Sequence, residues 1–138
     1  MPNIPASCMK LALALPFVAL FVAPAFAASL SCKSAEEFEC GPTGCERQTL
    51  HTVLLLDFKR QEITYCAGEG CYGARVVLVK AQDGGISFAF DAKPEERRRG
   101  ERVDRLVTIH PGRKNATVGN FLADGTVLFS RMSCEDRP

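Results

Sequence analysis

Histidine, tyrosine and tryptophan are scarce in this sequence. It has no tryptophan, two tyrosines and two histidines among 138 residues. Catalysis with a histidine base could use only His51 or His110, and a triad also needs an activated nucleophile and an orienting acid. Ser87 and Ser130 lie in strand-like runs, without the Gly-x-Ser-x-Gly turn that exposes a nucleophilic serine. We therefore expect both histidines to be structural residues, His110 in a surface turn and His51 at the start of a strand, and we expect the protein not to be an enzyme.

A long apolar segment is absent after residue 27. Before it, Lys10 precedes an apolar run over residues 11–26, and Ala25-Phe26-Ala27 provides the small residues that a signal peptidase requires. The run contains Pro16 and Pro24 and is shorter than the roughly 20 residues of a membrane span. Residues 1–27 are therefore predicted to be a cleaved secretory signal peptide, and residues 28–138 a single exported domain with no transmembrane segment. A lipid anchor is disfavoured, because Leu30 lies one place too close to Cys32.

Net charge is also absent from the predicted mature chain. Lys10 is the only charged residue of the signal segment, so 16 of the 17 basic residues and all 16 acidic residues remain. A neutral domain has no general attraction for nucleic acid or for a strongly charged partner. We therefore expect no nucleic-acid partner.

Cysteine, by contrast, is abundant. Cys8 leaves with the signal, and six cysteines remain in the mature chain: Cys32, Cys40, Cys45, Cys66, Cys71 and Cys134. An even number in a short exported chain predicts three disulfides, and six cysteines allow 15 pairings. We favour Cys40–Cys45 and Cys66–Cys71, which each bracket a glycine-containing turn, and Cys32–Cys134, which would join the two ends of the domain. Zinc binding and a redox role are less favoured alternatives, and no metal or cofactor is expected.

Alternation of apolar and polar residues predicts short β-strands along the whole mature chain. The strand-like runs are 49–58, 63–65, 74–79, 86–91, 103–109, 116–122 and 126–132. Seven or eight such strands separated by turns predict an all-β protein, an antiparallel meander that closes into a small barrel or sandwich. The predicted core is Leu54, Leu56, Phe58, Ile63, Tyr65, Val76, Leu78, Phe88, Phe90, Ile109, Phe121 and Phe129. One helical turn is predicted at 34–39, where Ser34 and Glu37 fit a capping box, and we expect the Glu36–Glu37 carboxylates to be solvated.

The segment 93–105 contains the most distinctive surface charge. It holds six basic and four acidic residues, among them Arg97, Arg98, Arg99, Arg102 and Arg105. Guanidinium groups bind carboxylates and phosphates bidentately, so these five arginines are the leading candidates for contact with a protein or an anionic surface. The alternative is a solvated loop whose charges neutralise one another.

In outline the chain is similar to the small exported, disulfide-bonded β proteins of bacteria, a group that includes periplasmic lysozyme inhibitors. The likeness covers the signal, size, strands and cysteines, and it assigns no functional residue. Our first hypothesis is a periplasmic or secreted, non-enzymatic binding module that acts through loops on a disulfide-linked scaffold. The second is a lipocalin-like barrel with an apolar pocket lined by Phe88, Phe90 and Phe121, and the third a small hydrolase. The hydrolase would need His51 or His110 within hydrogen-bond reach of a carboxylate in a cleft.

Overall fold

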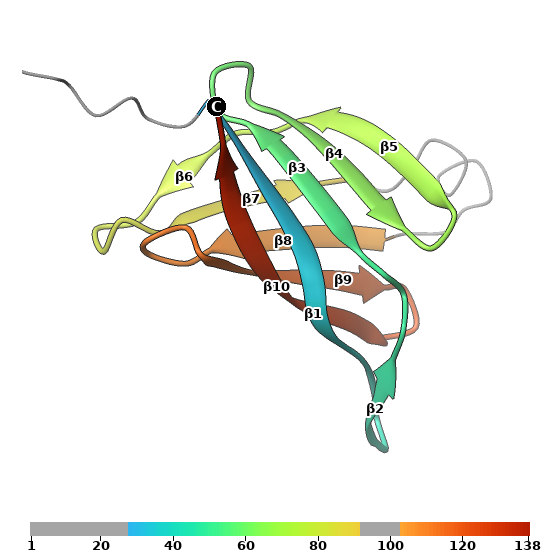
Figure 1. The fold of residues 1–138 in the computed structure, drawn as a ribbon. Helices are drawn as coiled ribbons and strands as arrows, with labels where there is room; N and C mark the ends of the chain where they lie inside the picture. Colours follow the sequence, from blue (N-terminus) through green and yellow to red (C-terminus); the bar gives the residue numbers. More distant parts are fainter. Residues whose placement is uncertain (1–27, 92–102) are drawn as a thin grey trace, which may run out of the picture.

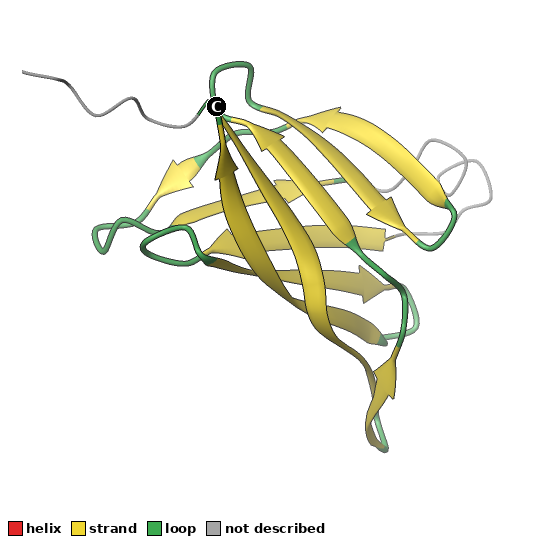
Figure 2. Cartoon of the chain, in the orientation of Figure 1, coloured by secondary structure: helices red, strands yellow, loops and turns green. Residues whose placement is uncertain are grey.

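The computed structural model describes residues 28–91 and 103–138, and these form ten β-strands without a helix (Figure 2). The predicted signal peptide and the arginines 97–99 and 102 lie outside the described residues. The all-β prediction is confirmed. The strands are β1 (Ser29–Gly41), β2 (Gly44–Gln48), β3 (Val53–Asp57), β4 (Glu62–Ala67), β5 (Gly70–Arg75), β6 (Val79–Lys80), β7 (Ile86–Phe90), β8 (Val103–Ile109), β9 (Asn115–Leu122) and β10 (Val127–Arg137).

All pairings are antiparallel, and the order across the sheet is β5-β4-β3-β1-β10-β9-β8-β7-β6, with β2 paired to β1. The first and last strands therefore lie side by side at the centre, and a meander extends from each of them (Figure 1). Within each half, strands that follow one another in the chain pair with one another, as the prediction of an antiparallel meander requires. The predicted closure into a barrel is wrong, because β5 and β6 end the order at opposite edges of the described sheet. Strand β6 has only two residues and offers little backbone for a closing ladder.

Residues 34–39 are strand rather than helix, contrary to the prediction. Strand β1 continues from Ser29 to Gly41, with one bulge between Ser34 and Glu36. It pairs with β10 along one side and with β3 and then β2 along the other. An isolated helical turn satisfies few backbone groups, whereas this central position pairs both edges of the strand. Tertiary pairing thus overrides the local capping pattern.

The core fills the inner face of the curved sheet. Eight of the twelve predicted core residues are buried: Leu54, Leu56, Ile63, Tyr65, Val76, Phe88, Phe90 and Ile109. Phe58 and Leu78 are partly buried and pack against this group. Phe121 and Phe129 were assigned to the wrong face. Their neighbours Asn120 and Ser130 are buried, so strand alternation directs the two phenylalanine rings outward, and Phe121 is 43% exposed.

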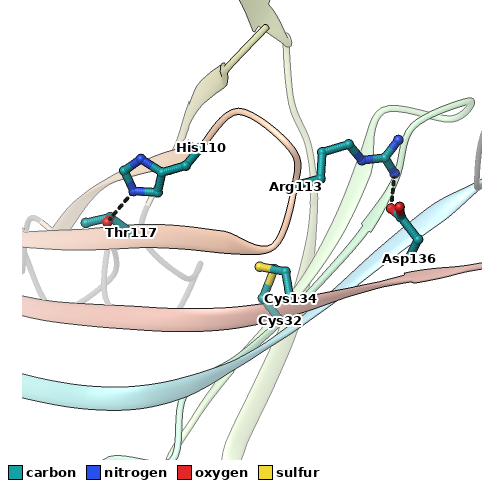
Figure 3. The surroundings of a disulfide bond; sticks show 6 residues. All are labelled: Cys32, His110, Arg113, Thr117, Cys134 and Asp136. Carbon is teal, nitrogen blue, oxygen red and sulfur yellow. Dashed lines mark hydrogen bonds and ion pairs between the residues drawn. A yellow bond between two sulfur atoms is a disulfide. The ribbon is translucent and has the colours of Figure 1, made fainter.

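Three disulfides are present, and they have the pairing that we favoured from the sequence. Cys40–Cys45 closes the β1–β2 hairpin and Cys66–Cys71 closes the β4–β5 hairpin. Cys32–Cys134 joins the directly opposed residues of β1 and β10, beside the turn that carries His110 and Arg113 (Figure 3). Three structural disulfides indicate an oxidising compartment. None of the described residues belongs to a helix that is long and apolar enough to cross a membrane.

Candidate functional site

A group of polar side chains lies on the inner face of the sheet, among the apolar side chains that the sequence predicted there. The Tyr65 hydroxyl of β4 accepts a hydrogen bond from the Asn120 amide of β9 at 3.1 Å. Thr52 and Ser130 are also buried, and their hydroxyl oxygens are 3.4 Å apart. Burial raises the pKa of Tyr65, although the Asn120 hydrogen bond and the nearby Arg105 charge partly oppose this. The phenol is therefore neutral in the folded protein and serves to position its neighbours.

Arg105 belongs to this interior group and not to a contact surface. It lies in β8, is 6% exposed, and its guanidinium lies over the rings of Tyr65, Tyr72 and Phe90 at 5.5, 5.9 and 5.8 Å. It also donates to the Asp91 carbonyl at 3.3 Å. We expected this side chain to contact a partner or to belong to a solvated loop. The strand alternation that sends Leu106 outward instead turns Arg105 inward, so its guanidinium is not available at the described surface.

We expect Arg105→Lys to lower the free energy of unfolding by about 2 kcal/mol, because the tetrahedral ammonium of lysine has no flat face to stack on the three rings. Urea denaturation followed by circular dichroism measures the change. Arg47→Lys is the matched control, since Arg47 is exposed and makes a surface ion pair with Glu36 at 3.3 Å. Its effect should be below about 0.5 kcal/mol. Equal stability of Arg105→Lys and the wild type would show that the stacking contributes nothing.

Glu37 also departs from expectation, because its carboxylate is buried rather than solvated. It is 4% exposed and accepts hydrogen bonds from the backbone N–H groups of Leu50, His51 and Thr52, the latter two at 3.0 and 2.8 Å. Burial by itself would raise the pKa of Glu37. Hydrogen bonds from Thr52, Leu50 and Ser34 outweigh it and lower the pKa to about 2. Glu37 thus fixes the segment between β2 and β3, and the contact is structural.

A hollow lies on the opposite, outer face of the sheet. It is an open groove of about 560 Å³ over β10, β1, β3, β4 and β5. A row of directly opposed residues crosses these five strands, in the order Arg137, Ser29, Asp57, Glu62 and Arg75. Leu56, which precedes Asp57 in β3, and Ile63, which follows Glu62 in β4, are buried. Successive side chains of a strand point to opposite faces, so the residues of the row point away from the core. We call this hollow the arginine groove, after Arg60, Arg75 and Arg137.

The floor of the arginine groove lies low, because two of its three central residues have a short side chain or none. The second row on the same face contains Leu55, Thr64 and Gly73, which are directly opposed across β3, β4 and β5. Gly73 has no side chain, and Thr64 is short. Space is therefore left above this row and between the flanking arginines. Sequence patterns do not reveal this space, because the five strands are scattered from residue 29 to residue 137.

The charges of the groove are held loosely. Arg60 lies 3.8 Å from Asp57 and Arg75 lies 3.4 Å from Glu62, and the two arginine side chains are 73% and 87% exposed. Exposed ion pairs of this kind contribute about 0–1 kcal/mol each. Arg137 has no ion pair with any carboxylate of the described residues. The groove has three guanidinium groups against two carboxylates, and its arginines can turn to an incoming carboxylate at little cost.

The rings of the two histidines are not paired with a carboxylate in the part of the chain that the structure describes. The His110 ring nitrogen Nε2 lies 3.0 Å from the Thr117 hydroxyl (Figure 3), and both residues line a smaller hollow of about 370 Å³. His51 contacts Glu37 through its backbone N–H and not through its ring. Among the described residues neither imidazole is hydrogen-bonded to a carboxylate. A cluster of three or more metal-ligating side chains is likewise not found in residues 28–91 and 103–138.

The three phenylalanines proposed to line an apolar pocket do not share one. Phe88 and Phe90 are 2% and 6% exposed and pack in the core, with their ring centroids 6.4 Å apart. Phe121 lies on the outer face. The reason is again alternation, since buried Asn120 fixes the direction of Phe121 in β9. The residues therefore do not support this pocket.

The fold and the groove define a disulfide-linked, all-β protein with an open antiparallel sheet. No family model matches the chain, and we found no match among the curated proteins. Among solved structures it is similar to a DUF4251 family protein from Bacteroides eggerthii DSM 20697, with 14% identity over 80% of each chain and a TM-score of 0.46. We base no functional argument on this likeness.

Proposed function

We propose that this protein is an exported, non-enzymatic binding module that holds an acidic polypeptide segment in the arginine groove. The observation that carries the proposal is the groove itself, a hollow of about 560 Å³ flanked by Arg60, Arg75 and Arg137. Guanidinium groups recognise carboxylates through paired hydrogen bonds. The carboxylates of an acidic segment would pair with these guanidinium groups.

Export supports this reading, because the predicted signal peptide and the three disulfides both fit a periplasmic or secreted protein. The rigidity of the site supports it as well. The groove is built on paired strands, and the Cys66–Cys71 and Cys32–Cys134 disulfides fix two of the strand pairs beneath it. A preformed site loses little conformational entropy when a ligand binds.

The test is a fluorescence-anisotropy titration with a labelled octapeptide of alternating glutamate and threonine. The wild type should bind this peptide, more weakly as salt is added. The triple variant Arg60→Ser, Arg75→Ser, Arg137→Ser should raise the Kd by about tenfold or more, because the loss of charged hydrogen bonds costs at least about 1.4 kcal/mol in total. Its melting temperature should change little, since the two ion pairs that it removes are exposed.

The matched control is the triple variant Arg97→Ser, Arg98→Ser, Arg99→Ser, which removes the same charge from the segment that the sequence favoured. It should bind the octapeptide as the wild type does. Loss of binding in this variant alone would move the contact to residues 97–99 and overturn the groove assignment. Absence of binding to the wild type would overturn the recognition of acidic segments altogether.

A further inference from the structure

We propose that the partner segment binds by adding a strand to the free edge of β5, an inference that rests on the proposed function and specifies its geometry. Strand β5 ends the sheet order, and among the described residues its only partner strand is β4. A sheet edge presents unpaired N–H and C=O groups that an extended peptide can pair with. The edge of β5 also forms one wall of the arginine groove.

The direction of the free backbone groups follows from one hydrogen bond. The Val76 N–H, just after β5, donates to the Gln61 carbonyl at 2.9 Å, on the side of β4. Backbone groups of an antiparallel strand alternate between its two sides, so Tyr72 and Ala74 also face β4. Cys71, Gly73 and Arg75 therefore direct their N–H and C=O groups away from the sheet. These three residues are also the exposed ones in the alternating burial pattern of β5.

Within residues 28–91 and 103–138, strand β5 lacks the features that commonly protect an edge. Natural edges are shortened, bulged, or blocked by proline or inward-pointing charges. The opposite edge strand, β6, has two residues. Strand β5 has six, pairs with β4 in unbroken register, and contains neither proline nor lysine. Its one charged residue, Arg75, points into the groove and not into the core.

The edge is also held rigidly from the side that faces the protein. The Cys66–Cys71 disulfide closes one end of the hairpin, and the Val76 hydrogen bond fixes the other. In between, the Tyr72 hydroxyl donates to the Asp91 carbonyl and its ring lies 6.2 Å from that of Phe90. These contacts leave the outward groups of Cys71, Gly73 and Arg75 in place for a ligand, so little ordering is needed on binding.

The side chains beside the edge specify the chemistry of the partner. An added antiparallel strand would place one residue opposite Arg75 and another, two positions later, opposite Gly73. A carboxylate suits the first position because Arg75 is 87% exposed and loosely paired. An aromatic side chain suits the second because the missing side chain of Gly73 leaves space over Thr64. The fitting partner is thus an extended segment with the pattern acidic-x-aromatic.

The test uses a labelled synthetic peptide, Thr-Val-Glu-Val-Phe-Val-Thr, which sets its glutamate opposite Arg75 and its phenylalanine opposite Gly73. The reversed peptide, Thr-Val-Phe-Val-Glu-Val-Thr, has the same composition and charge and should bind about tenfold more weakly. Amide hydrogen exchange of the full mature protein gives the decisive measurement. Peptide binding should protect the N–H groups of Cys71, Gly73 and Arg75 and leave those of Tyr72 and Ala74 unchanged.

Gly73→Thr separates binding from folding. A Cβ at this position would lie 3.4 Å from the Ile63 carbonyl oxygen, an ordinary contact, so the variant should fold. The threonine side chain would occupy the space that the phenylalanine of the first peptide needs. The variant should therefore bind this peptide about tenfold more weakly. Unchanged binding in this variant would overturn the edge geometry.

The outcomes distinguish the two proposals. If the groove triple variant loses binding, but the peptide does not protect the Cys71, Gly73 and Arg75 amides of the wild type, the groove proposal stands and strand addition is overturned. Failure of both this peptide and the glutamate–threonine octapeptide to bind would overturn both proposals. Protection of the same three amides without any peptide, in a protein that sediments as a dimer, would assign the edge to a second copy of this chain instead.

Discussion

Replacing both Cys32 and Cys134 by alanine should lower the free energy of unfolding by about 4–5 kcal/mol. The bond joins residues 102 positions apart, so its loss releases nearly the whole mature chain in the unfolded state. The two cysteines are also buried, at 0% and 4% exposure, between the central strands β1 and β10. A loss of this size is a large fraction of the stability of a small domain. Urea denaturation of the purified variant measures it.

The Cys40→Ala, Cys45→Ala variant is the control for this prediction. Its disulfide closes a loop of only five positions at the tip of the β1–β2 hairpin, where Cys45 is exposed. The same loop-entropy argument gives about 2 kcal/mol. Strands β1 and β10 should remain paired in this variant, and its midpoint should fall by less than half as much. Equal losses in the two variants would show that loop length does not determine the contribution of these disulfides.

Acid should destabilise the protein through Glu37. Its pKa is lowered from 4.5 to about 2 in the folded state, so the unfolded chain binds a proton at higher pH than the folded one. The stabilisation is complete above about pH 5 and is lost as the pH falls from about 5 toward 2. A shift of this size corresponds to about 3 kcal/mol. Unfolding free energies measured in urea between pH 7 and pH 2.5 should show this decline.

Glu37→Gln should remove this acid-dependent contribution and cost about 2–3 kcal/mol at pH 7, because a neutral amide replaces a carboxylate that accepts three backbone N–H groups. Glu39→Gln is the matched control on the same strand. Glu39 is exposed, and its carboxylate accepts a hydrogen bond from the Gln48 amide at 3.1 Å. This control should keep both the stability and the acid response of the wild type. An acid response that is equally strong in Glu37→Gln would assign it to other carboxylates.

Local pattern was sufficient wherever a feature involved neighbours in the chain. Strand β7 was predicted because Ile86, Phe88 and Phe90 alternate with polar or small residues, and these three side chains are buried. The two hairpin disulfides were favoured because each pair brackets a short glycine-containing turn. Such features depend on the two-residue period of a strand and on turn chemistry, and both are visible in a few consecutive residues.

Local pattern failed where long-range pairing decided the outcome. Residues 34–39 resemble a helix start, yet they lie in the central strand because β10, β3 and β2 all pair with β1. Phe121 and Phe129 were assigned to the core because they are large and apolar. Their actual direction follows from the register that turns Asn120 and Ser130 inward. Shifting a strand by one residue exchanges its two faces, and register is not encoded within one strand.

By itself, the sequence determined the all-β class and the six cysteines, and it supported the disulfide pairing and the prediction of export. Only the tertiary structure decided which polar residues are buried and which lie exposed around a hollow. It buried Arg105 and Glu37, which the sequence placed at the surface. It also assembled the arginine groove from residues as distant as Ser29, Arg75 and Arg137. The physical reason is that a sheet face joins residues by strand order and register, which depend on pairing across the whole chain.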